Sequence, residues 1–225
     1  MKTLTIIGGG GFVGKSFIDC FKRNKLSKFK IKKIFIICRN PKKIKKIKNL
    51  NFKNVKLIKG DISKLKILPI TDFYIYAAET TIISSYNDKK KIIQSHKKAI
   101  DNFCILAKKQ HLNNILYLSS GIVSREPGEN NSKYKKIYSK LKIYSENKIK
   151  ELAKNKLKTS IARCYSFVGQ WLPYKSHYAI ENFITDGIYN KIIRVNSTCK
   201  VVRSYMYADD LILWLAKIVS CSKID

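Results

Sequence analysis

The sequence predicts an α/β protein built on a doubly wound parallel sheet. Two observations predict it: short apolar runs alternate with stretches of helical length, and a glycine-rich turn follows the first run. The runs are rich in β-branched residues and apolar throughout, which is typical of strands that are buried on both faces. A sheet of this kind carries helices on both sides and binds ligands at the carboxyl ends of its strands.

The first half of the chain opens on "LTII" (4–7), a strand that ends at the glycines. The glycines open a helix at 12–24, whose N-terminal N–H groups can hold a phosphate. "IKKIFIIC" (31–38) and "VKLIK" (55–59) are the next two strands. Between them, lysines surround isoleucines at helical spacing, which predicts a solvated amphipathic helix at 41–50.

The second half continues the alternation with the apolar runs "DFYIYAA" (72–78), "NILYLSS" (114–120) and "KTSIARC" (158–164), which we interpret as strands. The stretches between them predict helices at 87–110 and 133–155. The sequence shows neither an internal repeat nor a linker of low complexity.

The pattern changes after Arg163, where glycines, a proline and several aromatic residues precede a predicted helix near 177–190. "VVRSYMY" then predicts a short strand that runs into a final helix. We expect residues 1–163 to form a nucleotide-binding core. Residues 164–225 are expected to form a small lobe over the strand ends, within a single structural unit.

Composition sets limits on the class of protein. The 225 residues suffice for one sizeable core. No apolar run approaches the roughly 18 residues of a membrane span, and the apolar N-terminus reaches glycines too early for a signal peptide. The six cysteines are scattered without metal-ligand spacing, so we expect free thiols in a reducing cytoplasm and no metal site.

The formal net charge of +31 suggests a polyanion-binding protein. The lysines, however, are spread over the whole chain together with many isoleucines and asparagines. An AT-rich coding sequence produces that joint bias without selection for a partner. We therefore expect no specific nucleic-acid binding, although a chain this basic adheres to polyanions at low salt.

The glycine-rich turn "GGGGFVGKS" (8–16) fits two kinds of phosphate site. Gly9, Gly14, Lys15 and Ser16 have the spacing of a P-loop, whereas Gly8 with the later glycines has that of a dinucleotide-binding turn. A P-loop enzyme also needs a strand that ends in an aspartate to handle Mg²⁺. The later strands end in "YAAE", "YLSS" and "IARC", without that aspartate.

A dinucleotide site predicts a polar residue on the adenine side and a ribose-reading residue after the second strand. Asp61 in "KGDI" fits the first requirement and Arg39 in "ICRN" fits the second. We therefore interpret the turn as dinucleotide-binding. Asp61 on its own would equally suit a turn or a helix cap.

Seven motifs occur in a fixed order along nearly the whole chain: "IIGGGGFVGKSF", "GDI", "YIYAAETT", "LYLSSGIVS", "YSKLKIYSE", "IARCYSFVG" and "VRSYMYADDL". In this order they resemble the extended short-chain dehydrogenases/reductases, in the branch of nucleotide-sugar epimerases, dehydratases and reductases. The resemblance implies a Rossmann-like fold with the cofactor across the carboxyl edge of the sheet. It also implies a C-terminal substrate lobe, shortened in this chain.

The resemblance implies a set of cofactor-binding residues: Gly8, Gly11, Phe12, Val13, Gly14, Arg39, Asp61, Ile62, Ala77, Ala78 and Glu79, with Tyr138 and Lys142. The turn after the second strand, "CRNPKK", has no acidic residue to accept a hydrogen bond from a ribose 2′-hydroxyl. Arg39 is able to pair with a 2′-phosphate, so we predict NADP(H) over NAD(H). The alternative is that Arg39 points to solvent.

The family's chemistry uses a Tyr-x-x-x-Lys pair with a serine or threonine, which the resemblance places at Ser120, Tyr138 and Lys142. Residues four apart share a helix face, so the lysine lies beside the tyrosine. Its charge, with that of an oxidised nicotinamide, is expected to lower the tyrosine pKa toward neutrality. The serine would hydrogen-bond the reacting substrate oxygen, with Ser119 as its rival.

The Tyr-x-x-x-Lys spacing also occurs at Tyr86/Lys90 and at Tyr144/Lys148. The first pair precedes the serine strand and is excluded by the order of motifs. Tyr144 lies about 240° around the helix from Tyr138, so only one of them faces a cofactor. The motif "YSKLKIYSE" favours Tyr138, and Tyr144 stays open as the alternative.

For the substrate, the resemblance points to Ser166, His177, Asn182 and Arg203, with Arg203 offering a bidentate fork to a diphosphate. His96 stands where relatives often carry an asparagine. A homodimer through the helix that carries Tyr138 is expected by analogy.

The leading hypothesis is an NAD(P)-dependent oxidoreductase or epimerase that acts on a nucleotide-activated sugar. Dehydrating relatives follow the strand-end serine or threonine with an Asp-Glu pair, whereas Gly121 and Ile122 follow Ser120 here. We therefore expect 4-keto reduction or epimerisation. The alternative is a degenerate cofactor-binding protein without turnover.

Overall fold

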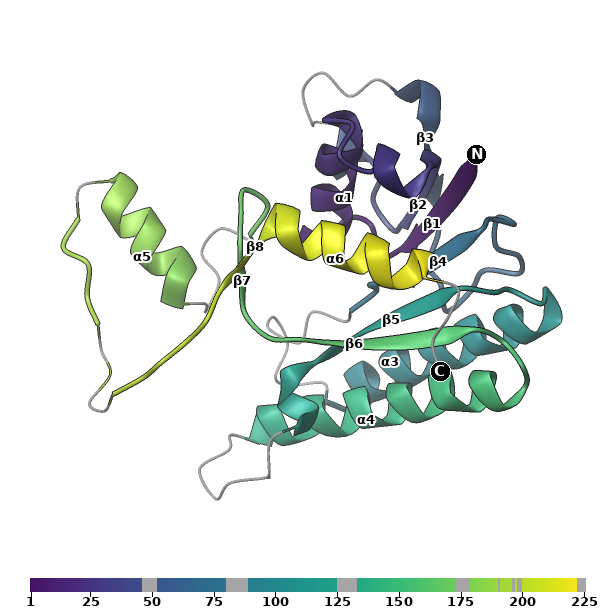
Figure 1. Cartoon of the computed structure of the whole chain (residues 1–225). Helices are drawn as coiled ribbons and strands as arrows, with labels where there is room; N and C mark the ends of the chain where they lie inside the picture. Colours follow the sequence, from purple (N-terminus) through teal and green to yellow (C-terminus); the bar gives the residue numbers. More distant parts are fainter. Residues whose placement is uncertain are drawn as a thin grey trace.

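The computed structural model describes residues 1–45, 52–79, 89–124, 133–172, 179–189, 191–195, 197 and 200–221. Its centre is a parallel six-stranded sheet in the order β3-β2-β1-β4-β5-β6 (Figure 1). The strands are β1 (Lys2–Ile7), β2 (Ile31–Cys38), β3 (Val55–Lys59), β4 (Phe73–Tyr76), β5 (Ile115–Ser120) and β6 (Thr159–Cys164).

The strand order confirms the predicted doubly wound fold. The chain runs outward from β1 to β3 and then returns to the other side of β1 to lay down β4, β5 and β6. The order therefore reverses between β1 and β4. In open α/β sheets the ligand crevice lies at this reversal, outside the carboxyl ends of the strands.

Helices cover both faces of the sheet, with α1 (Phe12–Lys22) and α6 (Ala208–Ser220) on one face and α3 (Lys89–Lys109) and α4 (Lys133–Lys154) on the other (Figure 1). The apolar strands explain this arrangement, because neighbouring side chains point to opposite faces. Ile36 packs in the cluster beneath α1 and α6, while Ile37 packs in the cluster beneath α3 and α4.

The predicted helix at 41–50 is described only as the short α2 (Lys42–Lys45), and its remainder lies outside the described residues. The other elements of the core agree with the sequence prediction to within two residues at each end.

The C-terminal segment holds α5 (Ala179–Ile188) and a two-stranded parallel sheet of β7 (Phe167–Val168) and β8 (Met206–Tyr207). The sequence prediction missed β7, because two residues are too few to show a pattern. The strand expected over "VVRSYMY" is confined to its last two residues. Stacking of Phe12 on Phe167, with ring centroids 5.2 Å apart, attaches this sheet to the start of α1.

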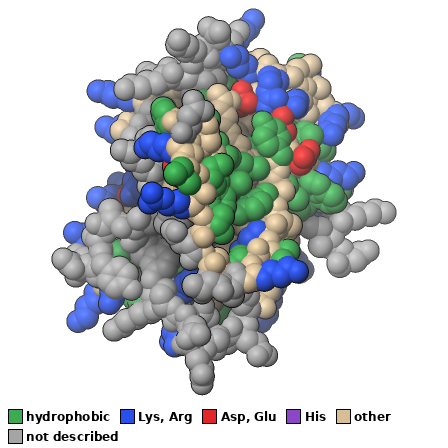
Figure 2. Space-filling view, turned by 90° about the vertical axis from the view of Figure 1, so that its left-hand side faces the viewer, with side chains coloured by type: hydrophobic (Ala, Val, Ile, Leu, Met, Phe, Trp, Pro, Cys, Tyr) green, Lys and Arg blue, Asp and Glu red, His purple; other side chains and the backbone are tan. Residues whose placement is uncertain are grey.

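α5 and the extended chain after it stand out from the core (Figure 1). Many apolar side chains of this part are exposed, among them Ile188, Ile192 and Val202. Figure 2 looks onto this side of the molecule and shows hydrophobic side chains gathered in the middle, with lysines and arginines around them.

No helix in the described part of the chain is long and apolar enough to cross a membrane. Within the same residues the cysteines at 20, 38, 104, 164 and 221 are free, as expected. The described residues contain no group of His, Cys, Asp and Glu side chains that is suited to hold a metal ion.

An ion cluster around Asp209 fastens α6 to α1. The Asp209 carboxylate accepts hydrogen bonds from Arg23 Nη1 at 2.8 Å and from Lys25 Nζ at 2.5 Å, and Cys20 Sγ lies 3.4 Å away. The hydrogen bonds from Arg23 hold the pKa of Asp209 well below its usual range, and those from Lys25 and Cys20 add to the effect. The cluster therefore stabilises the fold only while Asp209 is ionised.

We predict that Asp209→Asn lowers the free energy of unfolding at pH 7 by about 1–2 kcal/mol, since Lys25 and Arg23 lose the charge of Asp209, Arg23 keeps its ion pair with Asp19, and both cations are partly exposed. A depressed carboxyl pKa stabilises the fold above the unfolded value of about 3.9 and loses its effect below it. The difference from wild type should accordingly shrink as the pH falls below about 4. Urea denaturation of both proteins at several pH values measures it.

Asp210→Asn is the matched control, because Asp210 is the next residue of the same helix turn and is exposed. Equal losses in the two variants would contradict a specific role for the Asp209 cluster.

Candidate active site at the carboxyl edge of the sheet

The glycine turn brings β1, α1 and β4 unusually close together. Gly8 has φ +86°, and a Cβ there would lie 2.4 Å from the Ala78 Cα, so only glycine fits. A Cβ on Gly14 would lie 2.2 Å from the Gly9 Cα. Around Gly11, by contrast, the nearest atom to such a Cβ is 3.7 Å away. Gly11 caps the start of α1, so its open side leaves the N–H groups of that helix end accessible to a phosphate.

Lys15 distinguishes the two interpretations of this turn. Its ammonium group lies over the ring of Trp171, 5.5 Å from the centroid. A P-loop lysine instead reaches the phosphates. The sheet order is also that of a dinucleotide-binding fold. The turn thus fits a dinucleotide, and the aromatic contact accounts for Lys15.

Asp61 and Ile62 follow β3 at the same edge of the sheet. Asp61 Oδ1 accepts hydrogen bonds from Ser63 N at 2.9 Å and from Ser63 Oγ at 2.8 Å. Burial acts to raise the pKa of Asp61, but the Ser63 hydrogen bonds and the charge of Arg39 outweigh it and lower this pKa. Asp61 therefore caps its own turn, and Arg39 is exposed at the end of β2, close enough to feel the carboxylate.

The structure brings Ser120, Tyr138 and Lys142 together. The Lys142 side chain is buried, with Nζ 3.0 Å from the Leu118 carbonyl oxygen and 5.6 Å from the centroid of the Tyr138 ring. A side-chain hydrogen bond joins Tyr138 to Ser120 at the end of β5. α4 supplies the tyrosine and lysine one turn apart, and β5 supplies the serine.

The rival residues have other contacts. The Tyr144 hydroxyl donates to Asp101 Oδ1 on α3 at 2.7 Å, on a different side of α4. Ser119 Oγ donates to Glu146 Oε1 at 2.6 Å, and Arg163 on β6 holds the same buried carboxylate with two hydrogen bonds. This second network ties the end of β5 to α4 and β6.

The sequence did not indicate which residue Glu79 contacts. It follows Ala77 and Ala78 at the end of β4, where the motif suggested a residue lining the cofactor's path. Its carboxylate instead forms an ion pair with the Lys142 ammonium group. The residues lie 63 positions apart, so no local pattern in the sequence revealed the pair.

The protein's own groups act on the Tyr138 pKa apart from the charge of an oxidised nicotinamide, which was expected to lower it toward neutrality together with Lys142. Burial of the phenol and the negative charge of Glu79 raise the Tyr138 pKa. Lys142 and the Ser120 hydrogen bond act in the opposite direction and do not prevail. Burial of the phenol is the largest cause, and Glu79 adds to it by offsetting the charge of Lys142.

A model of the NAD dependent epimerase/dehydratase family matches residues 4–221. The chain belongs to this family. The resemblance found in the motifs is therefore confirmed. No curated protein matches the sequence significantly.

Solved structures agree on the fold. The UDP-N-acetylglucosamine 4-epimerase of Methanobrevibacter ruminantium is 18% identical with a TM-score of 0.80, over 99% of this chain and 74% of that one. The dTDP-glucose 4,6-dehydratase of Streptomyces venezuelae, with NAD bound, is 15% identical with a TM-score of 0.77, over 96% and 71%. The UDP-glucuronic acid 4-epimerase of Bacillus cereus, with UDP-glucuronic acid and NAD bound, is 16% identical with a TM-score of 0.77, over 98% and 74%.

His96 lies next to the ion pair between Glu79 and Lys142. Its ring is buried between α3 and α4, with Nε2 2.9 Å from Ser145 Oγ and Nδ1 3.8 Å from Glu79 Oε1. Burial lowers the His96 pKa, so the ring is neutral near pH 7 even though Glu79 acts to raise its pKa.

Three of the four residues expected to bind the substrate lie within the described part of the chain. Ser166 accepts a backbone hydrogen bond from Met206 at 3.0 Å, which joins the β7–β8 segment. Asn182 on α5 and Arg203 are exposed, and the Arg203 guanidinium donates to the Val202 carbonyl oxygen at 3.2 Å. His177 lies outside the described residues.

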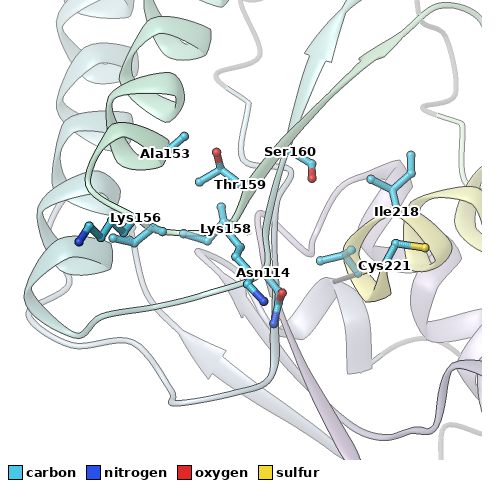
Figure 3. Close-up of a pocket in the computed structure, with 11 residues that line it drawn as sticks. Asn114, Ala153, Lys156, Lys158, Thr159, Ser160, Ile218 and Cys221 are labelled. Atoms are coloured by element: carbon cyan, nitrogen blue, oxygen red, sulfur yellow. The ribbon is translucent and has the colours of Figure 1, made fainter. Parts of the chain in front are cut away.

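A cavity of about 300 Å³ lies at the opposite edge of the sheet, at the start of β5 and β6 (Figure 3). Asn114, Lys158 and Thr159 line it together with Ile218 and Cys221 at the end of α6. It is remote from Ser120 and Cys164, which end the same two strands, and so it is separate from the candidate site.

Proposed function

We propose that this protein is an NAD(P)-dependent enzyme that transfers hydride at a carbinol or ketone carbon of a nucleotide-activated sugar. The observation that carries the proposal is the cluster of Ser120, Tyr138 and Lys142 beside the glycine turn, at the reversal of the strand order. Two solved structures of similar fold hold UDP-N-acetylmuramic acid and UDP-glucuronic acid, and a third is a dTDP-glucose 4,6-dehydratase, which supports this substrate class.

The residues of the turn fit a dinucleotide, which supplies or accepts the hydride when it is bound. The N–H groups at the start of α1, exposed beside Gly11, would hold its pyrophosphate, and Asp61 with Ile62 would lie on the adenine side. Lys142 would donate to the nicotinamide ribose. An ammonium group has three N–H donors, and the contacts with Leu118 and Glu79 account for two of them.

The chemistry at the substrate oxygen would fall to Ser120 and Tyr138. Ser120 would donate a hydrogen bond to that oxygen, and Tyr138 would move the proton to or from it as hydride moves at the carbon. Because Ser120 hydrogen-bonds Tyr138, the two hydroxyl groups are close enough to reach one oxygen atom.

The residues after Ser120 favour reduction or epimerisation over dehydration. A Cβ on Gly121 would lie 2.4 Å from the Tyr165 ring, so this position packs against an aromatic side chain and offers no acid. Ile122 donates its N–H to Ser120 Oγ, at 3.4 Å. The buried carboxylate of Glu146 is already held by Arg163 and Ser119. Elimination of water needs an acid and a base that these positions lack.

We propose further that residues 164–225 act as the substrate lobe on a core of residues 1–163, with Ser166, His177, Asn182 and Arg203 toward the sugar nucleotide. α6 also belongs to the core, since Leu211 and Leu215 pack with Phe17.

A homodimer through α4 is supported by exposed Ile105 and Ile143 on the paired helices α3 and α4.

A second candidate function is cofactor binding without turnover. The observation that favours it is the exposure of the Asn182 and Arg203 side chains, because orienting a substrate requires side chains that are held in place.

We predict that Tyr138→Phe abolishes activity and leaves cofactor affinity nearly unchanged, because only the proton transfer is lost. Lys142→Ala should weaken both. Tyr144→Phe, a matched change about 1.7 turns along the same helix, should retain activity. Rates with a panel of sugar nucleotides and fluorescence titration of the reduced cofactor measure these effects. An inactive Tyr144→Phe beside an active Tyr138→Phe would reverse the assignment.

We predict that the protein prefers NADP(H) and that Arg39→Ala lowers the preference ratio at least tenfold, because the guanidinium pairs with the 2′-phosphate. The NAD bound in solved relatives supports the opposite preference. Titration of wild type and Arg39→Ala with NADP(H) and with NAD(H) measures the preference ratio. Lys42→Ala is the control for the loss of a positive charge in the same region. An unchanged ratio in Arg39→Ala contradicts the role of Arg39.

We predict that incubation with UDP-glucose or dTDP-glucose yields no 4-keto-6-deoxy sugar, because Gly121 and Ile122 carry no proton. Reduction of a supplied 4-keto sugar, or epimerisation, should proceed. Mass spectrometry distinguishes the products by the loss of water. Formation of the dehydrated product at a rate comparable to reduction would show that another acid and base serve the site.

A further inference from the structure

The Lys142 ammonium group is a buried charge with one acidic partner among the described residues. Its side chain is about 4% exposed, while that of Glu79 is 34% exposed. A buried charge is costly unless it is paired, and the Lys142 ammonium group is stabilised both by the ion pair with Glu79 and by the hydrogen bond to the Leu118 carbonyl oxygen. Glu79 approaches from the end of β4, a different element from the α4 helix that carries the lysine and the tyrosine.

Charged and polar groups from several elements act on Tyr138. Lys142 belongs to α4, Tyr117 and Ser120 belong to β5, and Glu79 follows β4. Behind Glu79 lies His96 on α3, which contacts Ser145 on α4. Lys142 is the cation of this set and Glu79 is its anion. His96 is neutral, so it does not cancel the charge of Glu79.

We propose that Glu79 is a positioning residue that keeps Tyr138 in its phenol form by neutralising Lys142. The proposal rests on the proposed function. It implies that the site favours reduction of a ketone over oxidation of an alcohol. When a ketone is reduced, its carbon receives hydride from the reduced nicotinamide and its oxygen receives the proton of Tyr138. The tyrosine is left as phenolate beside Lys142. A site whose tyrosine is held as phenol is ready for this reduction, and oxidation of an alcohol requires the phenolate first.

Glu79 acts on Tyr138 through its charge and its place beside Lys142. In the low dielectric of the site, Glu79 offsets the attraction that Lys142 would exert on a phenolate. The Tyr138–Ser120 hydrogen bond does not depend on Glu79. Removal of the Glu79 charge is therefore expected to lower the Tyr138 pKa and to leave the arrangement of the serine and tyrosine intact.

The test follows the phenol directly, without cofactor or substrate. The full chain is labelled with ¹³Cζ-tyrosine, and the resonance of Tyr138 is assigned by its absence in Tyr138→Phe. In Glu79→Gln the Tyr138 titration should move at least one pH unit lower than in wild type. Glu151→Gln, an exposed carboxylate further along α4, should titrate as wild type does. The proposal is overturned if the Tyr138 phenol titrates at the same pH in wild type and Glu79→Gln. It is also overturned if the phenol stays protonated over the whole pH range in both proteins.

Two further measurements complete the design. The pH profile of alcohol oxidation should shift by the same amount to lower pH in Glu79→Gln, and the ratio of reduction to oxidation rates should fall at least tenfold at pH 7. If Glu79→Gln does not fold, Glu79→Asp should produce a smaller shift in the same direction, and no shift there overturns the proposal. Absence of turnover in wild type with every sugar nucleotide contradicts the proposed function, while the phenol titration still decides the role of Glu79.

Discussion

The buried ammonium group of Lys142 is the constraint around which the carboxyl edge of the sheet is arranged. An unpaired ion in this position would cost several kcal/mol. Its partners come from separate parts of the chain: the Leu118 carbonyl from β5 and the Glu79 carboxylate from the end of β4. Satisfying one charge thus fixes α4 against two strand ends, and it places Tyr138 beside Ser120.

The glycine turn forms the other half of the site by close packing. Gly8 lies so near Ala78 that the chain after β4 is held against the turn after β1, and Glu79 is the next residue after Ala78. The exposed glycine turn at Gly11 and the charged pair at Lys142 are therefore joined through the chain at the end of β4. The strand-order reversal between β1 and β4 is what makes this short connection possible.

The sequence was informative where one pattern or spacing carries the structure. Apolar runs predicted the six strands, and the i,i+4 spacing with motif order predicted Tyr138, Lys142 and Ser120 as neighbours. It was silent where contacts join distant residues. Glu79 and Lys142 meet only after the sheet forms, so their ion pair and its contribution to the raised Tyr138 pKa, beside the larger effect of burial, were not foreseen. The two-residue β7 is too short to show a pattern.

A crystal structure of the protein with a nicotinamide dinucleotide tests the account most directly. The account predicts the pyrophosphate over Gly11 at the start of α1, and the nicotinamide ribose within hydrogen-bond distance of Lys142. Tyr138 and Ser120 should both face the nicotinamide ring. A dinucleotide bound away from this edge, or a phosphate enclosed by the glycine turn and held by Lys15 as in a P-loop, would contradict it.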